Sequence, residues 1–266
     1  MKIFKDKHSL LTEILDKKTI SFVPTMGGLH KGHISLIKKT KSFSGQNLVT
    51  IFVNPRQFNT KKDFIKYPRN LDEDLKILKK LKVNFVYIPD KKDIFSFKPK
   101  KKVYLDAFSK KLCGRFRKGH FEGVLDIVNR FLEIIKPKRI FLGKKDYQQL
   151  YLINKHIIKK KIGTIVVKCK TIRNKNGVAY STRNKLLNKR QILIGSKVYK
   201  YLLNIKKSSF VNLKNIKKNI LNLGVKKIDY LEIYDLKNHR KSNKFNKHSK
   251  IFIAYYLDNI RLIDNI

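Results

Sequence analysis

Early in the chain the sequence reads Ile20-Ser21-Phe22-Val23-Pro24-Thr25-Met26-Gly27-Gly28-Leu29-His30-Lys31-Gly32-His33. It opens as a short apolar run, which is typical of a buried strand, and passes through a Gly-Gly turn toward a helix that begins near Gly32. The two histidines stand three residues apart, where the free N–H groups of a helix start can meet an anion. The stretch therefore predicts a strand, a phosphate-binding loop and a helix in direct succession.

The same order of elements recurs downstream. Short β-branched runs alternate with helical stretches, which predicts parallel βαβ units and a doubly wound sheet. After about residue 172 two helices and then two alternating runs follow, so we expect a smaller α+β unit and divide the chain into domains 1–172 and 173–266. The predicted strands are 20–23, 48–53, 85–88, 139–142, 164–168, 230–234 and 251–257, and the predicted helices are 32–42, 71–81, 123–135, 147–160, 189–206 and 211–223.

The composition is strongly basic, and a general drift toward Lys, Asn and Ile explains this better than a dedicated nucleic-acid site. The 266 residues include 63 Lys plus Arg and 19 Asp plus Glu, a formal net charge of +44. Such a charge suits a nucleic acid or an anionic substrate such as ATP. The lysines form no single tract and no nucleic-acid module is evident, so we expect no specific nucleic-acid binding. No apolar run approaches the ~20 residues of a membrane span. The first residues show no apolar segment and the two cysteines have no metal-ligand spacing, so we expect no secretory signal and a cytoplasmic protein without a membrane partner.

Two further motifs lie near the ends of predicted strands or the starts of predicted helices. Asn54 and Gln57 end the second strand and offer neutral amides at the carboxyl edge of the sheet, where ligands of such folds bind. A strand-ending turn with a polar cap would explain this pair equally well. Residues 119–123 read Gly-His-Phe-Glu-Gly and lead into a helix.

A second pair of segments offers phosphate ligands. Lys145 and Asp146 follow a strand and open a helix; the lysine can neutralise phosphate charge and the aspartate can hold Mg²⁺ or a ribose hydroxyl. Gln149 lies three residues after Asp146 and so shares its helical face. Residues 176–184 read Asn-Gly-Val-Ala-Tyr-Ser-Thr-Arg-Asn and offer two hydroxyls and a fork-shaped cation, Arg183. A surface Lys-Asp pair and an ordinary helix cap are the alternative readings.

Taken together and in this order, these segments resemble the pantothenate synthetase family. Its strings Pro-Thr-Met-Gly-x-Leu-His-x-Gly-His, Phe-Val-Asn-Pro-x-Gln-Phe, Gly-His-Phe-x-Gly-Val, Gly-x-Lys-Asp-x-Gln-Gln and Ser-x-Arg-Asn are present. So are Tyr-Pro-Arg-x-Leu-x-x-Asp, at residues 67–74, and the usual ending, at 258–265. The resemblance covers essentially the whole chain.

The resemblance implies a Rossmann-like N-terminal domain, a small α+β C-terminal domain that closes over ATP, and a homodimer. It implies an AMP-forming pantoate–β-alanine ligase of the vitamin B5 and coenzyme A pathway. In that reaction the pantoate carboxylate attacks the α-phosphorus of ATP, pyrophosphate leaves, and the amine of β-alanine displaces AMP from the pantoyl-adenylate. ATP is then a substrate, and Mg²⁺ accompanies it.

The resemblance also assigns catalytic roles. His33 corresponds to the proton donor, and His30 contacts the phosphates beside it. Lys145 and Arg183 neutralise phosphate charge. Asp74 is a weaker candidate, for the region of Mg²⁺ and the phosphates.

Substrate contacts follow in the same way. Gln57 and Gln149 correspond to the residues that hold pantoate, and Gln57 also to one that holds β-alanine. The expected ATP contacts are Met26, Gly27, Gly28, Leu29, His30, Lys31, Gly32, His33, Gly143, Lys144, Lys145, Asp146, Ile172, Tyr180, Ser181, Thr182 and Arg183.

Five positions depart from the family pattern. Lys144 and Cys113 stand where Glu is common, Lys118 replaces Pro, Tyr180 replaces Leu, and Thr182 replaces Ser. Because the expected direct ligands are retained, we expect activity, with affinity and loop rigidity as the properties these changes affect.

Two other functions are compatible with parts of the sequence. Another nucleotidyltransferase would share the His-x-Gly-His loop but would not need the pair Gln57 and Gln149. A nucleic-acid-binding protein would account for the charge but for none of the motifs.

Overall fold

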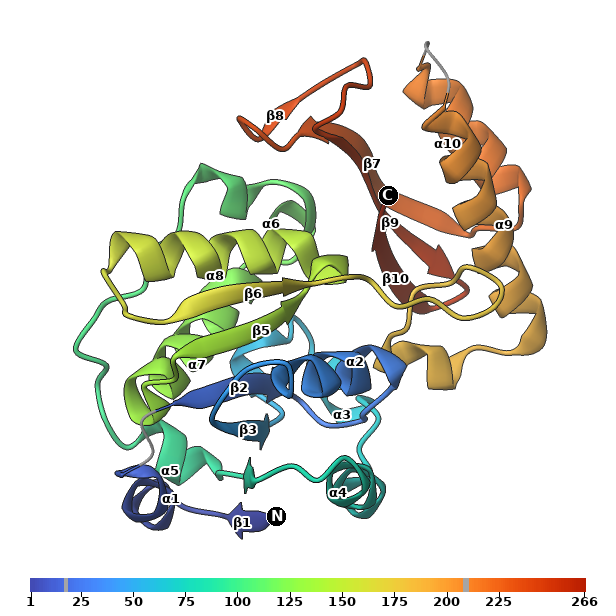
Figure 1. Ribbon diagram of the computed structural model, residues 1–266. Helices are drawn as coiled ribbons and strands as arrows, with labels where there is room; N and C mark the ends of the chain where they lie inside the picture. Colours follow the sequence, from blue (N-terminus) through green and yellow to red (C-terminus); the bar gives the residue numbers. More distant parts are fainter. Residues whose placement is uncertain (17–18, 208–210) are drawn as a thin grey trace.

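The computed structural model describes residues 1–16, 19–207 and 211–266 (Figure 1). The strands are β1 (Lys2–Phe4), β2 (Ile20–Thr25), β3 (Gln46–Ile51), β4 (Phe85–Tyr87), β5 (Arg139–Gly143), β6 (Ile165–Cys169), β7 (Lys227–Asp235), β8 (Arg240–Lys241), β9 (Ser249–Leu257) and β10 (Ile260–Asn265). The α-helices are α1 (Lys7–Ile14), α2 (Lys31–Thr40), α3 (Lys61–Ile65), α4 (Leu71–Lys80), α5 (Lys91–Phe95), α6 (Leu112–Phe116), α7 (His120–Ile135), α8 (Tyr147–Lys159), α9 (Lys189–Ile205) and α10 (Leu213–Asn222). Short 3₁₀ helices are η1 (Pro55–Gln57), η2 (Ala107–Lys110), η3 (Lys144–Asp146) and η4 (Thr182–Leu186).

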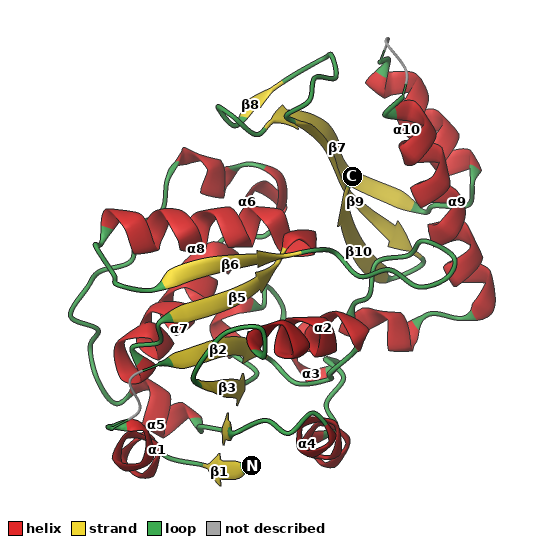
Figure 2. Cartoon of the chain, in the orientation of Figure 1, coloured by secondary structure: helices red, strands yellow, loops and turns green. Residues whose placement is uncertain are grey.

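Two sheets organise these elements (Figure 2). The larger sheet has six strands in the order β1-β4-β3-β2-β5-β6, and every neighbouring pair is parallel. The smaller sheet has four antiparallel strands in the order β10-β9-β7-β8. The predicted doubly wound α/β sheet with a smaller α+β unit is therefore confirmed.

Helices cover both faces of the larger sheet because its strands are apolar on both sides. Along β2, Phe22 packs into a core with α1, α5, α7 and α8, whereas the next residue, Val23, packs into a second core with α2 and α4. Both side chains are fully buried. The alternation follows from the period of two along a strand, and burial on both faces produces the continuous apolar runs seen in the sequence.

The strand order reverses beside β2. The chain passes from β2 outward through β3 and β4, and it later returns to the opposite side of β2 as β5 and β6. In open α/β sheets the crevice outside the carboxyl ends of the strands at such a reversal is the usual ligand site. The loop after β2 carries His30, the first turn of α2 carries His33, and η3, directly after β5, carries Lys145 and Asp146.

The smaller sheet packs beside this carboxyl edge, with α9 and α10 on its far side (Figure 1). Aromatic contacts join it to the main core: Phe108 meets Tyr234 at 5.4 Å between ring centroids, and Tyr147 meets Phe252 at 5.6 Å. Strand β10 adds the Asn265 amide, which donates to the carbonyls of Lys144 and Lys145 in η3. A domain boundary after residue 172 stays a prediction.

Most of the elements missed from the sequence are short or at a sheet edge; α1, with eight residues, was missed as well. Strand β1 has three residues, and α3, α5 and α6 have five each, too few to show a period. Strand β10 pairs with β9 through a tight turn in which Asp258 has φ +50°, a conformation that Asp adopts more readily than most residues. Across the described ranges, none of the helices has both the length and the apolarity needed to cross a membrane.

Candidate active site

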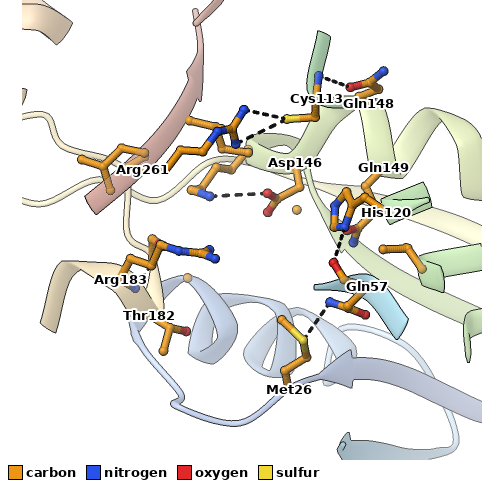
Figure 3. A pocket seen from close by; sticks show the side chains of 18 of the residues that line it. Met26, Gln57, Cys113, His120, Asp146, Gln148, Gln149, Thr182, Arg183 and Arg261 are labelled. Carbon is orange, nitrogen blue, oxygen red and sulfur yellow. Dashed lines mark hydrogen bonds and ion pairs between the residues drawn. The ribbon is translucent and has the colours of Figure 1, made fainter. Parts of the chain in front are cut away.

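A cavity of about 1200 Å³ opens at the carboxyl edge of the larger sheet (Figure 3). Residues of both sheet units and of the loops between them line it. Of the residues expected to bind substrates, those on its wall are Met26, His30, Gly32, His33, Gln57, Gly143, Lys145, Asp146, Gln149, Ile172, Tyr180, Ser181, Thr182 and Arg183. Gly27, Gly28, Leu29, Lys31, Lys144 and Asp74 do not line it.

The Gly-Gly turn is built around the Asp74 carboxylate. One oxygen accepts the Gly28 N–H at 2.8 Å and the other accepts the Leu29 N–H at 2.7 Å. Gly27 and Gly28 have φ of +75° and +61°, and a Cβ on Gly28 would lie 2.5 Å from Cγ2 of Thr182. Only glycine suits both the left-handed backbone and the close approach.

Asp74 therefore has a different place from the one expected of a metal ligand. Its side chain is buried and its oxygens are engaged by backbone donors. Burial raises the pKa of Asp74, while the two N–H donors act against that rise. The residues that the structure describes contain no group of three or more His, Cys, Asp or Glu placed to hold a metal ion. We assign Asp74 to the support of the loop.

The two histidines lie face to face at the start of α2. His30 is the N-cap, and its Nδ1 accepts the Gly32 N–H at 3.1 Å. Because Nδ1 is an acceptor here, the proton of the neutral ring lies on Nε2. The ring stacks on that of His33 with 4.0 Å between centroids. Nδ1 of His33 is buried and has no partner within the described part of the chain.

Both histidines are held neutral. Burial lowers the pKa of His30 to about 4, and the charge of Lys145 acts in the same direction. Burial also holds the pKa of His33 well below its usual range, helped by His30 and Lys145. At neutral pH each ring can donate one N–H hydrogen bond, but neither carries a positive charge.

The loop after β5 supplies the cation that faces them. Lys145 is mostly buried, and its Nζ lies 3.4 Å from Oδ1 of Asp146, whose side chain is about half exposed. The backbone of this turn is fixed by Asn265, as described above. Lys145 can therefore meet phosphate oxygens from a defined position, and Asp146 keeps oxygen atoms accessible for Mg²⁺ or a hydroxyl.

The Ser-Thr-Arg segment serves partly to hold loops together. Thr182 is buried; its hydroxyl donates to the Gly28 carbonyl at 3.2 Å and accepts from Tyr67 at 3.3 Å. Thr182 was expected to touch ATP, but its hydroxyl is committed to the Gly-Gly turn. Arg183 instead faces the cavity, with Nη2 at 3.1 Å from both carboxylate oxygens of Asp63.

Two adjacent glutamines have opposite surroundings. Gln148 is buried, accepts the Cys113 N–H and donates to the carbonyls of Phe108 and Lys111. The side chain of Gln149 has no hydrogen bond within residues 1–16, 19–207 and 211–266, and it lines the cavity (Figure 3). Both glutamines line the cavity. The hydrogen bonds of Gln148 are used within the protein, whereas Gln149, the residue indicated by the helical phase of Asp146, can bind a ligand.

The amide of Gln57 also lines the cavity. Its Nε2 donates to Sδ of Met26 at 2.8 Å, and its Oε1 accepts weakly from Asn54 at 3.4 Å (Figure 3). Asn54 itself is buried and donates to the Gly123 carbonyl at 2.9 Å, so it ties η1 to α7. Gln57 can exchange the weak sulfur contact for a substrate oxygen.

Several residues at the cavity were given no role from the sequence. Arg117 contacts His120, and Arg261 contacts Asp229 while its guanidinium faces the thiol of Cys113. Both arginines lie in or beside one of the family motifs. Their position next to a motif was the one feature of the sequence that could have identified them. Their partners are distant in sequence, and spacing could not reveal them.

A doubly wound parallel sheet, with a glycine turn and a helix start at its switch point, places the chain in the Rossmann-like class of nucleotide-binding enzymes. A family model described as "Pantoate-beta-alanine ligase" matches residues 2–266. A pantothenate synthetase of Francisella tularensis subsp. novicida (strain U112) is 38% identical over 267 residues, which covers 98% of this chain and 94% of that protein. The chain therefore belongs to the pantoate–β-alanine ligase family, and it is a ligase of pantothenate biosynthesis.

Solved structures agree with this assignment. The pantoate-beta-alanine ligase of Francisella tularensis, complexed with beta-gamma ATP and beta-alanine, has a TM-score of 0.86 and 37% identity, covering 100% of this chain and 97% of that one. The pantothenate synthetase of Thermus thermophilus has a TM-score of 0.92 and 27% identity, covering 100% and 99%.

Replacing Asp74 by Asn tests its supporting role. In the variant an NH₂ group takes the position of one carboxylate oxygen. It cannot accept the backbone N–H that this oxygen accepted, so we expect the free energy of unfolding to fall by ~1–3 kcal/mol. The KM for ATP should rise, while the Mg²⁺ concentration for half-maximal activity stays the same. Urea unfolding and metal titration measure the two effects. Asp72→Asn, exposed on the same helical turn, is the control. A tenfold shift in the Mg²⁺ requirement of Asp74→Asn alone would show that the carboxylate binds the metal.

The pKa of His30 is directly measurable. Histidine-selective NMR, assigned with His30→Gln, should give a titration midpoint of about 4. Because the unfolded state takes up this proton near pH 6.5, the neutral ring stabilises the fold fully above that pH, and this contribution is lost as the pH falls from 6.5 toward 4. A midpoint at or above 6.5 would mean that the ring is charged in the resting enzyme.

Proposed function

We propose that this ligase joins pantoate to β-alanine through a pantoyl-adenylate, with ATP bound across the switch point of the larger sheet. The arrangement that carries the proposal is the pair of neutral histidines at the start of α2, facing Lys145 across the cavity, with the amides of Gln57 and Gln149 on its walls. The histidines and Lys145 suit a polyphosphate, and the two glutamine amides suit a small polar acid.

In the first step a carboxylate oxygen of pantoate forms a bond to the α-phosphorus of ATP, and the bond from that phosphorus to pyrophosphate breaks. Such transfers depend on in-line positioning and on stabilisation of charge rather than on a protein nucleophile. His30 and His33 donate N–H groups, while Lys145 and Arg183 supply positive charge. To reach a phosphate, Arg183 must either release Asp63 or bind the phosphate with the N–H groups that Asp63 does not use.

Mg²⁺ arrives with the phosphates, and when bound it neutralises part of their charge. Asp146 is the carboxylate at the cavity whose exposed oxygens fit it, whereas Asp74 does not fit. A cation that takes most of its ligands from phosphate and water needs no closed set of protein ligands.

In the second step the uncharged amine of β-alanine forms a bond to the acyl carbon. The bond from that carbon to the phosphate oxygen breaks, AMP leaves, and the nitrogen gives up one proton. Gln57 and Gln149 orient pantoate without adding charge, and Gln57 also contacts β-alanine. The Gly143 and Ile172 segments border the nucleotide. We further propose a homodimer in the cytoplasm, on the family resemblance and the cysteine usage.

The experiment that tests this function is pantoate-dependent exchange of labelled pyrophosphate into ATP, followed by AMP release when β-alanine is added. His33→Ala should lower the exchange rate by about 10²–10³-fold, the usual cost of one lost donor at a developing charge. His8→Ala, at an exposed position, is the control. Exchange that proceeds without pantoate would reject the proposed acceptor.

The two neighbouring glutamines provide a second prediction. Gln149→Ala should raise the KM for pantoate roughly tenfold with little change in stability, because one exposed hydrogen bond to substrate is lost. Gln148→Ala should lower the melting temperature instead, because it leaves the Cys113 N–H and two carbonyls without their partner. Equal effects of both variants on the pantoate KM would contradict the assignment.

A further inference from the structure

Arg117 lies half-buried in the wall of the cavity, and every partner of its guanidinium is neutral. Nη2 donates to the Gln57 carbonyl at 3.1 Å and Nε donates to Oδ1 of Asn59 at 3.1 Å. Nη1 lies 2.9 Å from Nε2 of His120. These contacts use three of the five N–H groups and leave one on each terminal nitrogen.

His120 fixes this arrangement. Its Nδ1 lies 2.7 Å from the Gln57 carbonyl, which only accepts, so the proton is on Nδ1. Nε2 must then accept from Arg117. Burial lowers the pKa of His120 to about 3, and the positive charge of Arg117 is the second-largest contribution to this shift. The ring is therefore a neutral acceptor that positions the guanidinium.

The other basic groups that are half-buried in the cavity wall each have an acidic partner. Arg183 is paired with Asp63, Arg261 with Asp229 and Lys145 with Asp146. The remaining lysines at the cavity, Lys62, Lys66 and Lys170, are exposed to solvent.

Arg117 differs from them. Within the described ranges, no carboxylate lies within 4.0 Å of it. Burial lowers its pKa to about 10; the nearby charges of Arg183 and Arg261 add to this effect, while Cys113 and the more distant Asp63 act against it. The group is still charged at neutral pH. A half-buried cation without a counter-ion is unfavourable unless a ligand supplies one.

We propose that Arg117 binds the carboxylate of β-alanine and so selects an ω-amino acid over a simple amine. This inference rests on the proposed function. The guanidinium touches the backbone of Gln57, a residue proposed to contact β-alanine. Of the proposed phosphate ligands, His30, His33 and Lys145 follow β2 and β5, and Arg183 lies on η4. Two free N–H groups match the two oxygens of a carboxylate.

The chemistry separates the two carboxylates of the reaction. The carboxylate of pantoate is the nucleophile of the first step and must reach the α-phosphorus, so an arginine clamp on it would oppose the attack. The carboxylate of β-alanine is unchanged throughout, and an anchor on it leaves the amine free to turn toward the acyl carbon. Arg117 therefore suits the carboxylate of β-alanine.

The test compares two steps of one enzyme. Arg117→Gln should raise the KM for β-alanine about 100-fold, as expected for the loss of a charge-assisted, two-point contact. Pantoate-dependent pyrophosphate exchange, which takes place before β-alanine binds, should change by less than about threefold. The matched control is Arg115→Gln. Arg115 is exposed and lies over the Phe116 ring, so its replacement should change neither the KM for β-alanine nor the exchange rate.

A second readout reports on recognition alone. The normal enzyme should prefer β-alanine to 3-aminopropan-1-ol, which has the same chain but no carboxylate. Arg117→Gln should lose most of that preference, and Arg117→Lys should keep part of it. If Arg117→Gln does not fold, the preference of Arg117→Lys for β-alanine over 3-aminopropan-1-ol is the test, and it should be weaker than that of the normal enzyme.

An unchanged preference, or a rise in the KM for pantoate or ATP in place of that for β-alanine, would overturn the role of Arg117 while the ligase function stands. The absence of exchange in the unmodified enzyme would overturn both.

Discussion

The cavity depends on the parallel pairing of β2 with β5, in which Phe22 lies opposite Ile140. This register brings the carboxyl ends of two strands that are far apart in the sequence to the same edge of the sheet. Between them the chain crosses to the other side of β2, so no further strand connection fills the crevice. The histidine loop and the Lys145 loop face each other because of this one constraint, and the smaller sheet closes the side that remains.

The loops that meet there are held by polar contacts that span long stretches of chain. Asp74 fixes the Gly-Gly turn from α4, Thr182 fixes it from η4, and Asn265 fixes η3 from the last strand. These side chains hold the loops in place. They allow a cavity with several cations to keep His30 and His33 neutral, since the same burial and positive charge that attract ATP disfavour a protonated ring. We therefore propose that the histidines provide hydrogen bonds to ATP, and that Lys145 and Arg183 provide positive charge.

Much of the fold could be predicted because buried parallel strands are short and apolar on both faces. The predicted bounds of the five strands beyond β1 in the larger sheet lie within about two residues of those observed. Gln149 was placed at the cavity by its helical phase relative to Asp146. Asp74 could not be placed in this way, because an aspartate in the first turn of a helix is common and its partners are 45 and 46 residues away. Arg117 was missed for a related reason: an unpaired charge is recognised only when the groups around it are known.

The central claim is that the pantoate carboxylate becomes bonded to the α-phosphorus of ATP in this cavity. Pantoate labelled with ¹⁸O in its carboxylate tests it most directly, with the products analysed by mass spectrometry. We expect the AMP formed to carry one ¹⁸O atom, because the acyl carbon–oxygen bond breaks when β-alanine attacks. Unlabelled AMP, with the lost ¹⁸O found instead in inorganic phosphate or in water, would contradict it.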